Sequence, residues 1–156
     1  MKIVDSFLDK KDFTVVYDYC YSSKYSYGEQ DNPDTPVTGM ITEIDQTHIV
    51  WSIVESAIVK KHLKPDNLNI SRMYINCFAP GEIPYYHRDE SMWTFLLYIN
   101  KFIDINNGGE TILLDEDNNM IGILPLQNRL LKFKGNLLHK ATSNRYDHRF
   151  TLAIKY

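Results

Sequence analysis

The chain has 156 residues, 44% of them hydrophobic and 24% charged; these proportions are ordinary for a globular protein and exclude a disordered or fibrous chain. The length suits one domain, which we expect to span residues 1–156. The formal net charge of −3 at pH 7 provides no overall positive field for a polyanion, so we do not expect a nucleic-acid partner.

Cysteine content and hydropathy predict where the protein works. Cys20 and Cys77 are too few for a disulfide framework and form no cluster with histidine. No apolar run approaches the roughly 20 residues needed to cross a bilayer, and the charged residues within residues 1–11 do not fit a signal peptide. We therefore expect a reduced cytoplasmic location (the host cytoplasm if a phage encodes the protein) and no membrane partner.

Residues 1–67 are predicted to supply a short strand or entry segment at residues 2–7 and then two supporting helices. Ser6 or Asp9 can cap the first helix, whose apolar face has the spacing i, i+3, i+4 and i+7 in Phe13, Val16, Tyr17 and Cys20. The glycines and prolines of residues 22–39 predict a loop with at most a short strand, and residues 40–44 form another candidate strand.

Thr47 is the predicted cap of the second helix, and Pro65 follows its end. The apolar stripe of this helix consists of Ile49, Ile53, Val54, Ala57 and Ile58.

The pattern changes after residue 67. Short segments rich in β-branched and aromatic residues alternate with Gly, Pro and Asn turns; they are residues 68–78, 92–100, 110–114, 120–124, 129–134, 136–142 and 148–156. Two helices followed by seven strands predict a mainly β (α+β) fold, an antiparallel sandwich with the helices packed on one sheet.

Alternation along the last strand predicts two different faces. Leu152 and Ile154 point one way, towards the helices, and Arg149, Thr151 and Lys155 point the other way. The second face carries charged and hydroxyl groups, which predicts a ligand cavity that can hold an anion.

The sequence His87-Arg88-Asp89 is the first candidate for chemistry. On an extended segment the side chains of His87 and Asp89 point to the same side, and His139, some fifty residues later, is a candidate third ligand. Two imidazoles and one carboxylate form the facial triad of non-haem Fe(II) oxygenases, which leaves coordination positions open. The His-x-Asp pair is weak evidence when it stands alone, and His148 is a reserve ligand candidate.

Further motifs give residues 72–155 a resemblance to the 2-oxoglutarate- and Fe(II)-dependent dioxygenases, most closely to the prolyl 4-hydroxylases. In chain order the matching residues are Phe78-Ala-Pro-Gly81 before His87-Arg-Asp89, Thr94-Phe-Leu-Leu-Tyr98-Ile-Asn100, Asn107-Gly-Gly-Glu-Thr111, Pro125, Phe133, His139 and Arg149. The resemblance implies a double-stranded β-helix (jelly-roll) core over residues 68–156, with residues 1–67 as helical support and loop.

The resemblance also implies a reaction. Fe(II) would be bound by His87, Asp89 and His139, and 2-oxoglutarate and O2 would be cosubstrates; succinate and CO2 would be released, with ascorbate as a candidate reductant. Arg149 would pair with the C5 carboxylate of 2-oxoglutarate, helped by Tyr98 and Thr151.

Two positions depart from the family pattern. Phe78 stands where the family has a tyrosine that contacts the cosubstrate, and Tyr74, on the same face of that strand, is the candidate replacement. Lys155 stands where the family has a tryptophan.

The substrate is the least defined part of the prediction. A peptidyl proline or similar side chain in a peptide or protein is the leading expectation, with Tyr85 and Tyr86 as candidates for lining the mouth of the site. Residues 28–39 are either a substrate-covering loop or an ordinary surface connection. Oxidative demethylation of nucleobases, hydroxylation of a small molecule and ligand binding without turnover are the alternatives, and the oligomeric state is open.

Overall fold

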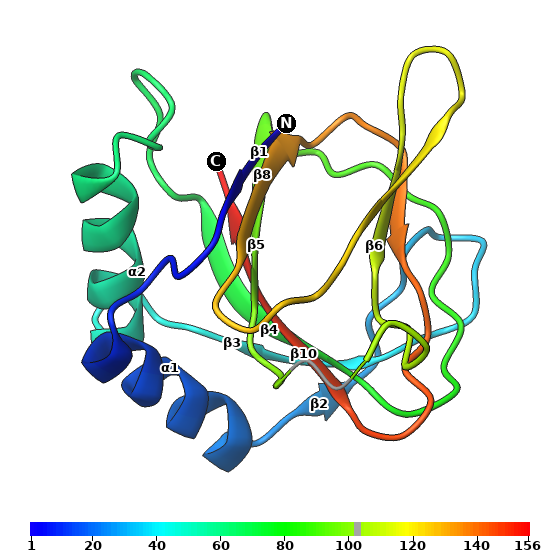
Figure 1. The fold of residues 1–156 in the computed structure, drawn as a ribbon, viewed down its shortest axis with the longest axis horizontal. Helices are drawn as coiled ribbons and strands as arrows, with labels where there is room; N and C mark the ends of the chain where they lie inside the picture. The colour runs from blue at the N-terminus through cyan, green and yellow to red at the C-terminus, as the bar shows by residue number, and fades with distance from the viewer. Residues whose placement is uncertain (102–103) are drawn as a thin grey trace.

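The computed structural model, which describes residues 1–101 and 104–156, contains two antiparallel β-sheets that face each other (Figure 1). The larger sheet has the described strands β1 (Lys2–Val4), β8 (Leu130–Lys134), β5 (Trp93–Tyr98), β10 (Arg149–Lys155), β4 (Arg72–Phe78), β3 (Met40–Glu43) and β2 (Ser26–Tyr27), in that order. The smaller sheet consists of β7 (Met120–Ile123), β6 (Thr111–Leu114) and β9 (His139–Ala141). The predicted mainly β fold with a jelly-roll core is confirmed.

The helices α1 (Lys10–Ser22) and α2 (Ile49–Lys60) cover the face of the larger sheet that points away from the smaller sheet (Figure 1). Their apolar stripes, with Val16 and Val54 fully buried, pack on the sheet in one hydrophobic cluster. Three strands from residues 1–67 (β1, β2 and β3) extend the larger sheet, so this segment contributes strands as well as the two predicted helices.

The predicted alternation along β10 is confirmed. Leu152 and Ile154 belong to the cluster beneath the helices, whereas Ala153 belongs to a second cluster between the sheets. Arg149 and Thr151 share the side of Ala153, where they line a cavity. The backbone period of two therefore places polar groups inside the sandwich and leaves an apolar layer under the helices.

The helix caps match the prediction at α1 and correct it at α2. Asp9 caps α1, as expected. The cap of α2 is His48, whose Nδ1 accepts a hydrogen bond of 3.2 Å from the amide of Val50. The prediction of Thr47 was wrong because its hydroxyl donates instead to Asp45 in the preceding turn, at 2.6 Å.

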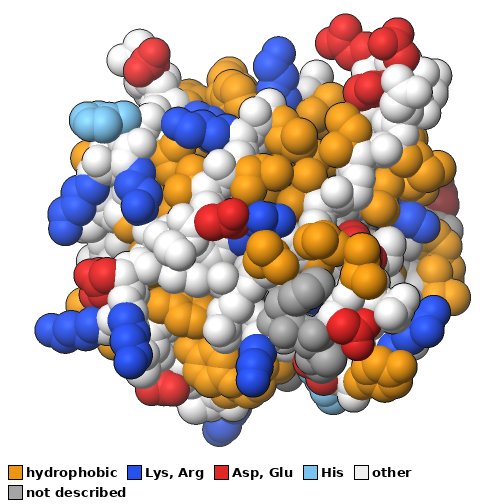
Figure 2. All heavy atoms as spheres, in the orientation of Figure 1, with side chains coloured by type: hydrophobic (Ala, Val, Ile, Leu, Met, Phe, Trp, Pro, Cys, Tyr) orange, Lys and Arg blue, Asp and Glu red, His pale blue; other side chains and the backbone are white. Residues whose placement is uncertain are grey.

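No described helix is long and apolar enough to cross a membrane. On the face drawn in Figure 2, basic side chains lie singly or in small groups among acidic, hydrophobic and uncharged ones. Both cysteines are buried and free.

Candidate active site

A cavity of about 640 Å³ opens between the two sheets. Side chains of the larger sheet form much of its wall, namely Arg72, Tyr74, Asn76, Phe78, Leu96, Arg149, Thr151 and Lys155. Residues 29–33 and Thr38, from the loop between β2 and β3, line the cavity together with His87, Asp89 and His139.

The predicted pair of histidines is brought together by backbone pairing. His87 and His139 lie opposite each other in an antiparallel bridge, with hydrogen bonds of 2.9 and 3.0 Å between their amides and carbonyls. Directly opposite residues of an antiparallel pair project to the same side of the sheet, and the ring centroids lie 4.4 Å apart.

Asp89 completes a group of three possible ligands. Its Oδ1 lies 3.8 Å from Nε2 of His87, and its Oδ2 lies 3.6 Å from Nε2 of His139. One ligand atom from each of the three residues falls within 4.8 Å of the others. The structure therefore assembles the predicted His87, Asp89 and His139 triad on one side of the cavity, whereas the reserve candidate His148 is exposed and outside this group.

A hydrogen bond of the His139 ring leaves its Nε2 atom facing the other residues of the triad. Nδ1 of His139 lies 2.8 Å from the carbonyl of Leu137, which fixes Nδ1 as the protonated nitrogen and leaves Nε2 with its lone pair. Burial lowers the pKa of His139 to about 4, against the opposing effect of Asp89. The ring is therefore neutral at pH 7, the form that binds a metal.

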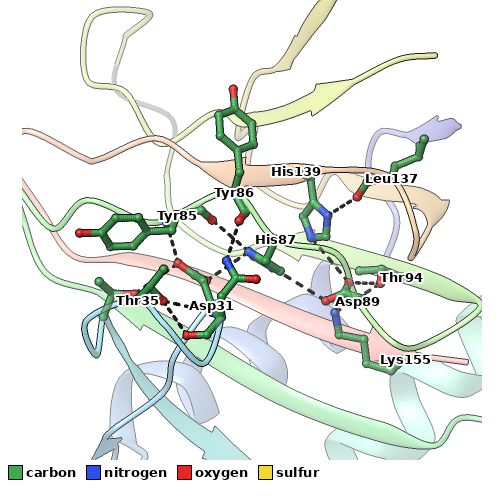
Figure 3. A network of polar contacts seen from close by, with 12 residues as sticks. Asp31, Thr35, Tyr85, Tyr86, His87, Asp89, Thr94, Leu137, His139 and Lys155 are labelled. Carbon is green, nitrogen blue, oxygen red and sulfur yellow. Dashed lines mark hydrogen bonds and ion pairs between the residues drawn. The ribbon is translucent and has the colours of Figure 1, made fainter. Parts of the chain in front are cut away.

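Asp89 has two further partners on its Oδ2 atom. The Lys155 ammonium and the Thr94 hydroxyl both contact this oxygen, as Figure 3 shows. Burial alone would raise the pKa of Asp89, but the charge of the nearby Lys155 and the hydrogen bonds from Lys155 and Thr94 override this effect, and the pKa lies below its ordinary value. The carboxylate is therefore ionised and held in place.

A second cluster surrounds Arg149, which is 4% exposed. Its Nη1 donates to Thr151 at 3.1 Å and its Nη2 to Thr111 at 3.2 Å. Tyr98 donates to the same Thr111 hydroxyl at 2.7 Å. No carboxylate of the described residues forms an ion pair with this guanidinium, so the cluster is a buried cationic site that an anion can balance.

The turn at Gly108 and Gly109 holds this cluster in place. Gly109 has φ +84°, and a Cβ atom added there would lie 2.2 Å from Oδ1 of Asn144. Because glycine allows this close approach, the Gly109 carbonyl accepts a hydrogen bond of 2.8 Å from Nε of Arg149. The motif that supports the family resemblance thus orients the guanidinium.

Tyr74 and Phe78 both line the cavity, at different positions along β4. Phe78 lies opposite Arg149 in the register of β4 and β10, whereas Tyr74 lies opposite Ala153. The Tyr74 ring lies beneath the Arg72 guanidinium (4.1 Å to the ring centroid). Tyr74 is therefore nearer the triad end of β10 than Phe78 is.

The prediction that Tyr85 or Tyr86 lines the mouth of the cavity needs correction. Both rings point away from the triad in Figure 3, and neither contributes to the cavity wall. Tyr86 precedes His87 by one residue, so alternation places its ring on the other side, where Lys140 lies 4.7 Å from the ring centroid. The Tyr85 amide donates to the Asp31 carboxylate at 2.6 Å, and its side chain is 37% exposed.

The loop between β2 and β3 contacts the triad, which the sequence did not predict. Oδ1 of Asp31 lies 3.3 Å from Nδ1 of His87 (Figure 3). Asn32 donates to the carbonyl of Tyr86 at 2.7 Å. Of the two interpretations of residues 28–39, the contacts favour a loop that covers the site.

The sequence did not predict the roles of three residues in the site. Thr111 was noticed only as the end of the Asn-Gly-Gly-Glu-Thr motif, Lys155 only as a departure from the family, and Asp31 not at all. The sequence did carry a signal for Lys155, which shares the face of Arg149 six residues earlier. No local pattern identifies Asp31, since its partner is distant in the chain.

No model of a known protein family matches the sequence, and no curated protein does either. Solved structures are similar in fold. One is a prolyl hydroxylase from Trichoplax adhaerens in complex with a peptide fragment of the hypoxia inducible factor oxygen degradation domain (TM-score 0.78, 21% identity, covering 99% of this chain and 82% of that one).

Two bacterial structures are also similar. A prolyl-4-hydroxylase from Pseudomonas putida has TM-score 0.79 and 15% identity, with 99% of this chain and 90% of that one covered. An oxidoreductase of the 2OG-Fe(II) oxygenase family from Burkholderia pseudomallei has TM-score 0.72 and 10% identity, with 98% and 82% covered. The chain has the fold of the 2-oxoglutarate- and Fe(II)-dependent oxygenases, and within that fold it resembles the prolyl hydroxylases.

Proposed function

We propose that this protein is an Fe(II)- and 2-oxoglutarate-dependent dioxygenase that hydroxylates a prolyl or similar side chain of a peptide. The observation that carries the proposal is one cavity that holds both a triad of two histidines and a carboxylate and a buried arginine without an acidic partner among the described residues. The proposal treats residues 1–156 as a single catalytic domain.

The donor set of the triad fits Fe(II). Two imidazole nitrogens and one carboxylate on one side of a cavity are the ligand set that such oxygenases use, and they leave positions open for other ligands. His87, Asp89 and His139 would hold the metal, and the carbonyl of Leu137 fixes the orientation of His139. When bound, the metal and 2-oxoglutarate supply the oxidative chemistry, with O2 consumed and succinate and CO2 released.

The site around Arg149 fits the distal carboxylate of 2-oxoglutarate. A planar guanidinium binds a carboxylate through two parallel hydrogen bonds, and an anion would balance a buried charge that has no acidic partner among the described residues. Tyr98 and Thr151 are the proposed hydroxyl contacts, and Thr111 orders both Tyr98 and Arg149. Tyr74 is the proposed replacement for the hydroxyl that Phe78 lacks.

The remaining residues of the cavity position the substrate and exclude water. The loop that carries Asp31 and Asn32 packs against the segment before His87, so it can cover a substrate next to the metal. A peptide substrate is supported by the peptide complex of the similar Trichoplax adhaerens enzyme. The proposal includes ascorbate as reductant and a reduced cytoplasmic location, which the two free, buried cysteines support.

Two measurements test the proposal. Anaerobic protein with Fe(II) is expected to gain a visible charge-transfer band when 2-oxoglutarate is added, and Asp89→Ala is expected to lose both iron binding and the band. No band in the wild type, together with unchanged iron binding by Asp89→Ala, would contradict the oxygenase assignment.

The substrate class is tested by comparing proline-rich peptides, methylated oligonucleotides and free amino acids for stimulated succinate release. We expect the peptides to give the largest stimulation. Greater stimulation by oligonucleotides would replace the proposal by oxidative demethylation, and greater stimulation by amino acids would replace it by small-molecule hydroxylation.

A further inference from the structure

Lys155 is a buried cation in direct contact with a candidate metal ligand. Its ammonium contacts Oδ2 of Asp89 and lies 3.3 Å from the Thr94 hydroxyl, which contacts the same oxygen (Figure 3). The residue is 9% exposed, and Asp89 is its only ion-pair partner among the described residues.

The sheet register fixes this arrangement. On β10, Lys155 lies opposite Arg72 of β4 on one side and Thr94 of β5 on the other. Its side chain projects from a strand with neighbours on both sides into the cavity, with its ammonium 5.9 Å from the centroid of the Tyr74 ring. Because the backbone of Lys155 is paired on both sides, a loop movement does not displace it from the site.

The two oxygens of Asp89 consequently have different surroundings. Oδ2 has two donors, Lys155 and Thr94, whereas Oδ1 lies 3.8 Å from Nε2 of His87. The donors fix the rotation of the carboxylate and direct Oδ1 towards His87, while Oδ2 lies 3.6 Å from Nε2 of His139. Lys155 also places a positive charge on the same carboxylate that would bind a divalent cation.

We propose that Lys155 is a built-in counter-ion of Asp89, which stabilises the metal-free site and weakens the binding of the divalent metal. This inference rests on the proposed metal site. Without metal, the ion pair removes the cost of an unpaired buried carboxylate. A divalent cation held by the triad would share Asp89 with the Lys155 ammonium, and the two positive charges would repel each other where screening by water is poor.

Two opposing effects decide the sign of the prediction. Removing a group that hydrogen-bonds to a metal ligand and orients it usually lowers the metal affinity by about 10- to 100-fold. Removing a positive charge next to a divalent ion raises the affinity, and Thr94 still holds Oδ2 when Lys155 is replaced. We expect the loss of repulsion to prevail.

The test compares variants that separate the charge from the hydrogen bond. Lys155→Gln keeps a donor and removes the charge, Lys155→Arg keeps the charge, and Thr94→Val removes a neutral orienting bond. Mn(II) affinity is measured by electron paramagnetic resonance, and the thermal midpoint is measured with EDTA and with Mn(II). Lys140→Gln is the matched control, since Lys140 also lines the cavity but its ammonium lies over the Tyr86 ring.

We expect Lys155→Gln to bind Mn(II) at least tenfold more tightly than the wild type and to have a lower thermal midpoint in EDTA. Lys155→Arg and Lys140→Gln should stay within threefold of the wild type, and Thr94→Val should bind more weakly. If the glutamine variant does not fold, Lys155→Met replaces it, because its unbranched stem fills the same buried path.

Unchanged or weaker Mn(II) binding by the neutral variants would overturn this inference and leave the proposed function intact. A wild-type protein that binds neither Mn(II) nor Fe(II) would overturn the proposed function and this inference with it.

Discussion

Oδ1 of Asp31 lies 3.3 Å from Nδ1 of His87, so the loop between β2 and β3 provides a carboxylate behind a candidate metal ligand. The other oxygen of Asp31 accepts the Tyr85 amide at 2.6 Å, which attaches the loop to the segment that carries His87. The Asp31 side chain thus connects the covering loop to His87 and can orient its imidazole.

Asp31→Asn is expected to lower the affinity for Mn(II) by about tenfold or more, because carboxylates behind a ligating histidine fix its orientation and raise its basicity. Isothermal titration calorimetry measures the effect. Asp34→Asn is the control, since Asp34 is exposed in the same loop; equal effects of the two variants would show that only the charge of the loop matters.

Arg149→Ala should weaken 2-oxoglutarate binding by more than about 100-fold, because losing one partner of a buried charge pair costs about 3–5 kcal/mol. Mn(II) binding should remain within threefold of the wild type. Both constants are measured on Mn(II)-loaded, anaerobic protein, and the exposed Arg145→Ala is the control. An equal loss of metal and cosubstrate binding would mean that Arg149 supports the fold and does not bind the cosubstrate.

Thr111→Val removes the hydroxyl that accepts from both Tyr98 and Arg149. We expect the free energy of unfolding to fall by about 1–3 kcal/mol, the cost of leaving buried donors without a partner. Urea denaturation measures it. Thr151→Val, whose hydroxyl accepts from Arg149 alone among the described residues, should cost less; the reverse order would contradict the role given to Thr111.

Gly109→Ala should destabilise the protein by about 1–3 kcal/mol more than Gly81→Ala, the usual range for overpacking. Both glycines have positive φ (+84° and +80°), so the backbone strain is similar. Only at Gly109 would the new Cβ meet a neighbour, Oδ1 of Asn144 at 2.2 Å, whereas nothing lies within 4 Å at Gly81. Equal midpoints in urea would mean that the turn can move away from Asn144 without cost.

The stability of metal-free protein should fall on acidification through the titration of His139. Burial lowers its folded-state pKa from 6.5 to about 4, so between these pH values the unfolded chain binds a proton that the folded chain does not. The free energy of unfolding therefore decreases as the pH falls through this window, by on the order of 3 kcal/mol. Urea denaturation in EDTA measures the slope.

His139→Gln should remove this slope between pH 6.5 and 4, and His148→Gln, which changes an exposed histidine, should retain it. A wild-type stability that is flat across the window would contradict the burial of a neutral imidazole.

Much of the fold could be predicted because it depends on local patterns. Turn residues separate the strands, alternation assigns their faces, and an apolar period near 3.6 marks both helices. The cap of α2 was misplaced because Thr47 and His48 both have a suitable side chain, and the hydroxyl of Thr47 is used by Asp45. The position of Tyr85 could not be predicted because residues 79–92 lack a regular strand, whereas the place of Tyr86 next to His87 was a signal that its ring lies on the other side.

The sequence by itself determined the residue types of the site: two histidines, an aspartate and an arginine at the positions of an oxygenase pattern, on strands whose alternation directs Arg149 inward. Only the tertiary structure decided which groups surround them. Lys155 meets Asp89, and Asp31 meets His87, through pairing between segments distant in the chain. Such contacts depend on strand register and on loop packing, and neither is encoded in the local spacing of residues.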